Sequence, residues 1–129
     1  MIYVDTSVAL AHLLSEERQP PESMWTEELV SSRLLEYEAW TRIHGAGLAR
    51  THAEPLRQLL ARIAFLELRP AVLSRALDPF PAPVRTLDTL HLASVEFLRE
   101  REQDVRLATY DRRMLAAARR MGMPLFELP

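Results

Sequence analysis

The sequence has no cysteine, and glycine supplies only three of its 129 residues. Without cysteine there is no disulfide, no thiolate nucleophile and no structural zinc held by sulfur. With so few glycines the chain contains no Gly-x-Gly-x-x-Gly run, so it offers no dinucleotide-binding motif. All sixteen basic residues are arginine, and lysine is absent. Codon bias explains that as well as function does, although arginine suits phosphate better than lysine.

The chain also lacks long hydrophobic runs. A stretch such as "SVALAHLL" is far shorter than the roughly 20 residues that span a bilayer. No basic segment followed by an apolar stretch and a cleavage site opens the chain, so no secretory signal is visible, and a cytoplasmic protein is expected. The net charge of −2 does not indicate nucleic-acid binding by bulk electrostatics. The composition, 48% hydrophobic and 26% charged, is typical of a soluble globular protein.

Short strand-like runs alternate with helical ones along the chain, which predicts an α/β fold with a parallel sheet. We find no internal repeat or linker, so one compact domain is expected over residues 1–129. The predicted strands are 2–4, 28–32, 65–70, 105–109 and 124–128. The predicted helices are 7–17, 33–45, 52–64, 71–77, 87–101 and 111–121, the second and third forming an antiparallel hairpin.

Two acids follow strands. Asp5 comes directly after "IYV", and Asp111 follows "VRLAT" with only Tyr110 between. In an open parallel sheet the carboxyl ends of the strands form the ligand-binding edge, so both acids are expected at that edge. Each acid is equally suited to cap the helix that follows it, and capping is compatible with chemistry.

Two further acids lie on helices. Asp88 is in the first turn of "RTLDTLHLASVEFL", where it either complements the helix dipole or meets a cation. On the helix after the second strand, Glu36 and Glu38 lie roughly 160° apart and cannot face one site. We favour Glu38, which falls on the side expected to face the sheet, with Arg42 one turn away as a possible ion-pair partner.

Converging carboxylates with no lysine to neutralise them would repel one another, and a divalent cation resolves that conflict. An all-oxygen ligand set suits Mg²⁺ or Mn²⁺, and two such ions can assist phosphodiester cleavage. His91, in a mostly apolar helix, is more simply a hydrogen-bonded core residue than a ligand. Arg112 and Arg113 open a helix, where cations oppose the dipole, which suggests contact with phosphate, although exposed helix arginines are common.

Four blocks of this sequence together resemble the PIN domain, and more narrowly the VapC-type toxins of bacterial toxin–antitoxin pairs. They are "YVDTSVAL", "VSSRLLEYEAW", "VRTLDTLHLAS" and "LATYDRRMLAAARRMG". The four stand in the family's order and cover nearly the whole chain. The resemblance implies a single PIN domain over residues 1–129, with three α/β/α layers around a central parallel sheet.

The resemblance also assigns site residues. It implies an acidic quartet of Asp5, Glu38, Asp88 and Asp111, with Thr6 and Thr109 as accompanying hydroxyls. It further implies a Mg²⁺- or Mn²⁺-dependent endoribonuclease that cleaves RNA with an activated water, forms a homodimer and binds a VapB-type antitoxin. The sequence departs from the family at 17–28, "ERQPPESMWTEE", which is short and proline-rich where many relatives carry another helix.

Other readings of the first acid are weaker. A receiver domain needs an early acidic pair and a late lysine, and a haloacid-dehalogenase-like phosphatase needs Asp-x-Asp, whereas Thr6 and Ser7 follow Asp5 here. A catalytically silent PIN-like binding module stays open as the alternative. A metal titration would distinguish the two, since a scaffold need not bind Mn²⁺.

Overall fold

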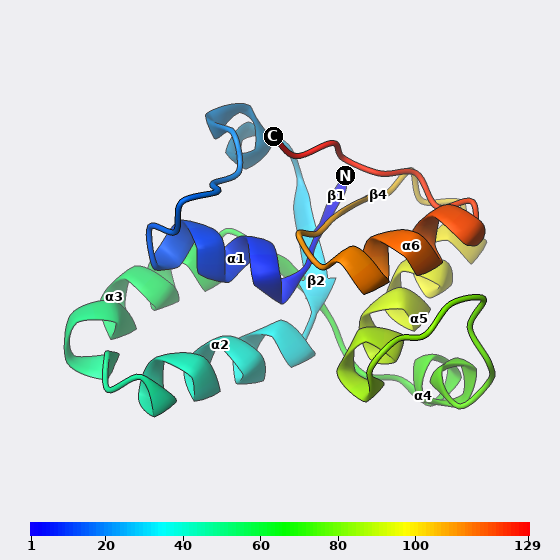
Figure 1. Ribbon diagram of the computed structural model, residues 1–129, viewed down its shortest axis with the longest axis horizontal. Coiled ribbons are helices and arrows are strands. Elements are labelled where there is room, and N and C mark those ends of the chain that lie inside the picture. Colours follow the sequence, from blue (N-terminus) through cyan, green and yellow to red (C-terminus); the bar gives the residue numbers. More distant parts are fainter.

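The computed structural model describes all 129 residues and contains one parallel four-stranded sheet (Figure 1). The strands are β1 (Ile2–Val4), β2 (Leu29–Ser32), β3 (Ala64–Leu66) and β4 (Arg106–Ala108), arranged in the order β3-β2-β1-β4. The parallel sheet predicted from the sequence is therefore confirmed. The order places β1 and β4 side by side, which brings the ends of the first and last strands together.

Six α-helices connect and cover the strands. They are α1 (Thr6–Leu13), α2 (Leu34–Gly45), α3 (Ala49–Leu60), α4 (Pro70–Ala76), α5 (Thr86–Glu100) and α6 (Arg112–Arg120). In the proline-rich segment between α1 and β2 the chain forms a single 3₁₀ helix, η1 (Glu22–Thr26). Two consecutive prolines before it remove two backbone donors, so a regular helix cannot run through this segment.

The sheet is buried on both faces. In β1, Ile2 and Val4 pack in one apolar cluster with Trp25, whereas Tyr3 between them packs in another with Leu92. Alternating side chains of a strand point to opposite faces, so each cluster lies on its own side of the sheet. Helices α1 to α3 lie on one side and α4 to α6 on the other, as Figure 1 shows. This confirms the three-layer α/β/α fold.

The helices meet the sheet through the apolar spacing that the sequence displays. In α6, Met114, Ala117 and Ala118 are buried at i, i+3 and i+4, while the arginines at both ends of the helix stay exposed. Such spacing gives a helix one apolar stripe to bury. Helices α2 and α3 pack against each other as the predicted hairpin.

Four predicted boundaries are wrong. The strand predicted at 65–70 spans Ala64–Leu66, and Pro70 begins α4. The run 124–128 forms one bridge, between Leu125 and Leu107, instead of a strand. The first helix ends at Leu13, because Ser15 has a φ of 50° and turns the chain out of the helix. The third helix spans Ala49–Leu60 and stops before Ile63, which enters the core ahead of β3. No helix is long and apolar enough to cross a membrane.

Candidate active site

Asp5 lies where β1 and β4 end together. Val4 pairs with Ala108 in the sheet, and the Asp5 amide donates to the Ala108 carbonyl at 3.0 Å. Thr109 Oγ1 and Ser7 Oγ donate to Asp5 Oδ2 at 2.8 and 2.6 Å, and the same oxygen caps α1 by accepting from the Ser7 amide. The carboxylate is buried, with one oxygen fully engaged and Oδ1 free of hydrogen bonds.

Glu38 reaches the same place from α2. Its Oε1 accepts hydrogen bonds from Thr6 Oγ1 at 2.7 Å and from His91 Nε2 at 2.7 Å. Glu36 turns away and forms an ion pair with Arg33 at 3.3 Å. The structure thus brings Glu38 and not Glu36 to the acid cluster. Arg42 forms no ion pair with Glu38, so the expected pairing of these two residues is wrong. The Glu38 carboxylate is held by Thr6 and His91 instead.

His91 connects these acids from the core side. Its ring is 1% exposed, and Nδ1 lies 2.7 Å from Tyr3 Oη, whose oxygen also accepts from the Ser32 amide at 3.1 Å. Nε2 lies 2.7 Å from Glu38 and 3.8 Å from Asp5 Oδ1. The expectation of a hydrogen-bonded core histidine is confirmed. Sequence reasoning missed that the same ring joins two acids of the site, although its place one turn after Asp88 was a usable signal.

Asp88 and Asp111 share one cation. Arg85 Nε lies 3.6 Å from Asp88 Oδ2, and Arg85 Nη2 lies 3.1 Å from Asp111 Oδ2. The Arg85 amide also donates to Asp88 at 3.4 Å, as a first-turn acid does when it caps its own helix. Asp111 Oδ1 caps α6 by accepting from the Arg113 and Met114 amides. Arg85 was not singled out from the sequence.

The charges of neighbouring groups shift the pKa values of the site residues. Burial raises the pKa of Asp88, and the negative charges of Asp111 and Asp5 raise it further. Burial also opposes the charge on Glu38, but the hydrogen bond and charge of His91, with the Thr6 hydroxyl, lower its pKa overall. For His91, burial alone would lower the pKa, but Tyr3, Glu38 and Asp5 together raise it well above the ordinary value.

The donor set fits a hard divalent cation by its chemistry. Asp5 Oδ1, Glu38 Oε2 and Asp88 Oδ1 accept no hydrogen bond, so three carboxylates each keep one oxygen free. Carboxylate oxygens are the ligands that Mg²⁺ and Mn²⁺ prefer. As the side chains stand, however, no three of the acids and histidines lie close enough to hold one ion. Arg85 occupies Asp88 and Asp111 in this arrangement.

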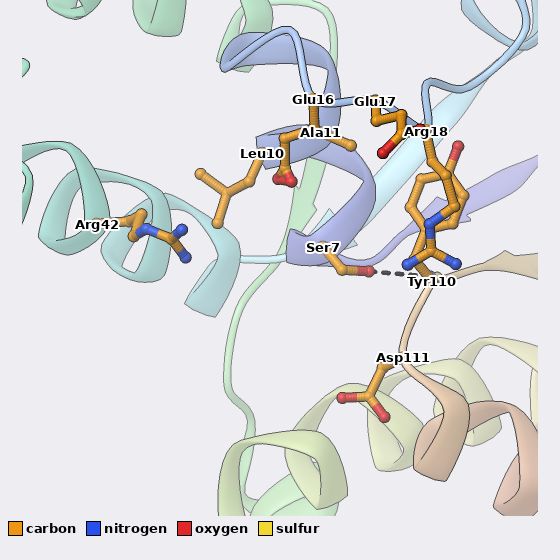
Figure 2. Close-up of a pocket in the computed structure, with 9 residues that line it drawn as sticks. All are labelled: Ser7, Leu10, Ala11, Glu16, Glu17, Arg18, Arg42, Tyr110 and Asp111. Carbon is orange, nitrogen blue, oxygen red and sulfur yellow. Dashed lines mark hydrogen bonds between the residues drawn. The ribbon is translucent and has the colours of Figure 1, made fainter.

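Three hollows lie beside the cluster, and one of them, about 440 Å³, is lined by Thr6 and Glu38. The other two adjoin each other at Tyr110. The larger, about 610 Å³, is lined by Ser7 and Asp111 and by Arg42 and Arg18 on opposite walls (Figure 2). The smaller, about 190 Å³, is lined by Arg112, one of the two arginines singled out from the sequence. Arg113 is exposed and lines none of the three.

Comparisons with known proteins identify the family. The PIN domain family model matches residues 2–120. The chain is also similar to "Ribonuclease VapC47" from Mycobacterium tuberculosis (strain CDC 1551 / Oshkosh), with 30% identity over 129 residues. That alignment covers 95% of this chain and 93% of the mycobacterial protein.

Proposed function

This chain belongs to the PIN domain family, and on that premise we propose that it is a metal-dependent endoribonuclease and the toxin of a VapBC-type pair. The observation that carries the proposal is the convergence of four acids from separate parts of the chain: Asp5, Glu38, Asp88 and Asp111. The name of the similar mycobacterial ribonuclease supports RNA as the substrate.

In this proposal Asp5, Glu38, Asp88 and Asp111 would hold one or two Mg²⁺ or Mn²⁺ ions, and a bound ion would supply activation of a water and charge stabilisation for phosphodiester hydrolysis. Ser7 and Thr109 fix Asp5 through Oδ2 and leave Oδ1 free for the ion. Thr6 and His91 fix Glu38 in the same way through Oε1. Arg85 would have to leave Asp88 and Asp111 for these two acids to hold an ion. The attacking group is water, so no side-chain nucleophile is needed.

The test is cleavage of a labelled RNA pool by the purified chain in Mn²⁺, in Mg²⁺ and in EDTA. We expect cutting only with a divalent ion, and a loss of at least about 100-fold in Asp5→Asn, which can still cap α1 and accept from Thr109. Glu36→Gln is the matched control for Glu38→Gln, because both acids are on α2 and only Glu38 contacts the cluster. Undiminished cutting by Asp5→Asn would overturn the assignment.

The alternative is a catalytically silent binding module of the same family. Intact acids with free oxygens argue against it, because a pure scaffold does not need them. The same preparation separates the two readings. Absence of both cleavage and Mn²⁺ binding would favour the scaffold. Helix capping would then be the only role of Asp5 and Asp111.

We also propose two protein partners, a second copy of the chain and a VapB-type antitoxin, acting together in the cytoplasm where the RNA is. Leu73 on α4 and Leu77 directly after it are 43% and 88% exposed, which leaves apolar surface for a protein partner. Light scattering of the pure chain should give twice the monomer mass. Coexpression with a VapB-type antitoxin should yield a complex in which cleavage is suppressed.

A further inference from the structure

A chain of buried hydrogen bonds leads through the protein core to Glu38. The Ser32 amide donates to Tyr3 Oη at 3.1 Å, and Tyr3 Oη lies 2.7 Å from His91 Nδ1. The other ring nitrogen, His91 Nε2, lies 2.7 Å from Glu38 Oε1. Ser32 and Tyr3 are fully buried, and His91 is almost so. The chain therefore joins the backbone of β2 to one oxygen of a proposed metal ligand.

Packing alone does not explain these polar side chains. Tyr3 lies in an apolar cluster with Val30 and Leu92, where a phenylalanine would fill nearly the same space. A buried hydroxyl or imidazole destabilises a fold unless each of its polar atoms has a partner. Here the Tyr3 hydroxyl and both ring nitrogens of His91 have one. A fully satisfied buried network is rigid, and this one ends at the Glu38 carboxylate.

The two ends of the network fix the orientation of the His91 ring. An ionised carboxylate only accepts hydrogen bonds, so Nε2 is the nitrogen that donates to Glu38. Nδ1 is held on the opposite side by the Tyr3 hydroxyl, and the two rings meet edge to face with centroids 5.8 Å apart. The imidazole cannot turn without breaking the hydrogen bonds at both nitrogens.

Ser32 also holds Glu38 by a second route. Its hydroxyl accepts from the Leu34 amide at 3.1 Å at the start of α2, and Glu38 is one turn further along that helix. One residue at the end of β2 thus anchors the backbone that carries Glu38 and, through Tyr3 and His91, its side chain. These contacts occupy Oε1, and Oε2 accepts no hydrogen bond.

We propose that Tyr3 is a positioning residue for metal binding: it fixes the His91 ring, and His91 fixes the Glu38 carboxylate with Oε2 free for a divalent ion. Outer partners of this kind orient a ligand before the ion arrives and so raise the affinity for metal. Tyr3 itself hydrogen-bonds none of the four acids. This role rests on the proposed function and adds a residue of the core to the groups that set the metal affinity.

The first measurement needs no metal. Nuclear magnetic resonance of the chain with isotope-labelled histidine, in EDTA, detects a ring hydrogen that is protected from exchange by burial and hydrogen bonding. We expect a protected Nε2 hydrogen on His91 in the wild type. It should exchange faster in Tyr3→Phe, because the ring has lost its partner at Nδ1. Equal protection in the two chains would overturn the proposal.

The second measurement is the Mn²⁺ affinity by calorimetry, at a temperature where every variant is folded. Tyr3→Phe should weaken Mn²⁺ binding about tenfold, as the loss of an outer partner does. Val72→Ala is the matched control, since it removes buried volume from an apolar cluster on α4 and touches no member of the network. It should bind Mn²⁺ as the wild type does. An equal loss in Val72→Ala would reduce Tyr3 to a structural role.

A double variant tests whether Tyr3 acts through Glu38. In the Glu38→Gln chain, Tyr3→Phe should weaken Mn²⁺ binding no further, because the carboxylate that it positions is gone. The same loss in both backgrounds, or no loss in either, would overturn the positioning role. Metal-dependent cleavage by the wild type would still support the proposed function in that case. A wild-type chain that neither binds Mn²⁺ nor cleaves RNA would overturn both.

Discussion

At the scale of single residues, the site depends on how each carboxylate is held. Glu38 owes its position to His91, a residue far along the chain, and His91 in turn to Tyr3. The helical angles of α2 were enough to favour Glu38 over Glu36 from the sequence. They could not reveal His91 or Arg85 as partners, because nothing in a local pattern says which distant side chain will pack against it. The expected pair of Glu38 with Arg42 was wrong for the same reason.

The raised pKa of His91 gives a pH prediction for the metal-free protein. A histidine whose folded pKa lies above its unfolded value contributes stability that is fully present below about pH 6.5 and is lost as the pH rises through the folded pKa. Thermal unfolding in EDTA should therefore show a melting temperature that falls from about pH 6.5 towards pH 9. The chain has no cysteine to titrate in this window, and a variant at His91 separates its contribution from those of the N-terminal amine and the other three histidines.

His91→Gln is the matched variant, since its amide can still donate to Glu38. Its melting temperature should lack that alkaline decline. His91→Leu should cost about 3 kcal/mol, because it leaves Tyr3 and Glu38 without a buried partner. A decline of the same slope in wild type and His91→Gln would assign it to other groups.

At the scale of elements, β1 and β4 each deliver an acid that also caps the following helix. Alternation of strands and helices, and the apolar stripes of the helices, made most of these elements predictable from the sequence. The C-terminal run 124–128 was not, because its apolar pattern suits a strand but only Leu125 pairs with β4. Pairing at a sheet edge depends on the neighbouring strand, which no single run specifies.

Two substitutions at Asp111 separate its role as a helix cap from its proposed role in metal binding. Asp111→Ala removes the acceptor for the first amides of α6 and should lower the free energy of unfolding by about 1 kcal/mol. Asp111→Asn keeps an acceptor and should stay within a few tenths of a kcal/mol of wild type. Both should weaken Mn²⁺ binding, measured by calorimetry. Wild-type Mn²⁺ affinity in Asp111→Asn would leave Asp111 as a cap alone.

At the scale of the whole molecule, folding itself assembles the acids, since they come from α1's cap, α2, α5 and α6's cap. Parallel-sheet topology made the meeting of Asp5 and Asp111 predictable. The precise spacing was not, since it depends on how α2 and α5 pack against β1 and β2. That one domain spans residues 1–129, and that the four acids bind metal, stay predictions.

An ion that binds only the folded site must stabilise the fold. With free Mn²⁺ at 100 times its dissociation constant, the free energy of unfolding should rise by about 2.7 kcal/mol. Differential scanning calorimetry in EDTA and in Mn²⁺ measures this directly. Asp5→Asn should show little of the increase, and Glu36→Gln should show all of it. An equal increase in Asp5→Asn would place the ion elsewhere.

Arg85 spans Asp88 and Asp111 across the acidic edge, and its side chain is 69% exposed. The proposed binding of a divalent ion at this edge is therefore an exchange of cations. The singly charged Arg85 side chain, which stays attached to the chain, leaves the two aspartates as the doubly charged ion arrives. Because the displaced cation remains attached to the chain, it can return as soon as the ion is withdrawn. Chelation would accordingly return Arg85 to both aspartates and leave the nuclease inactive but still folded.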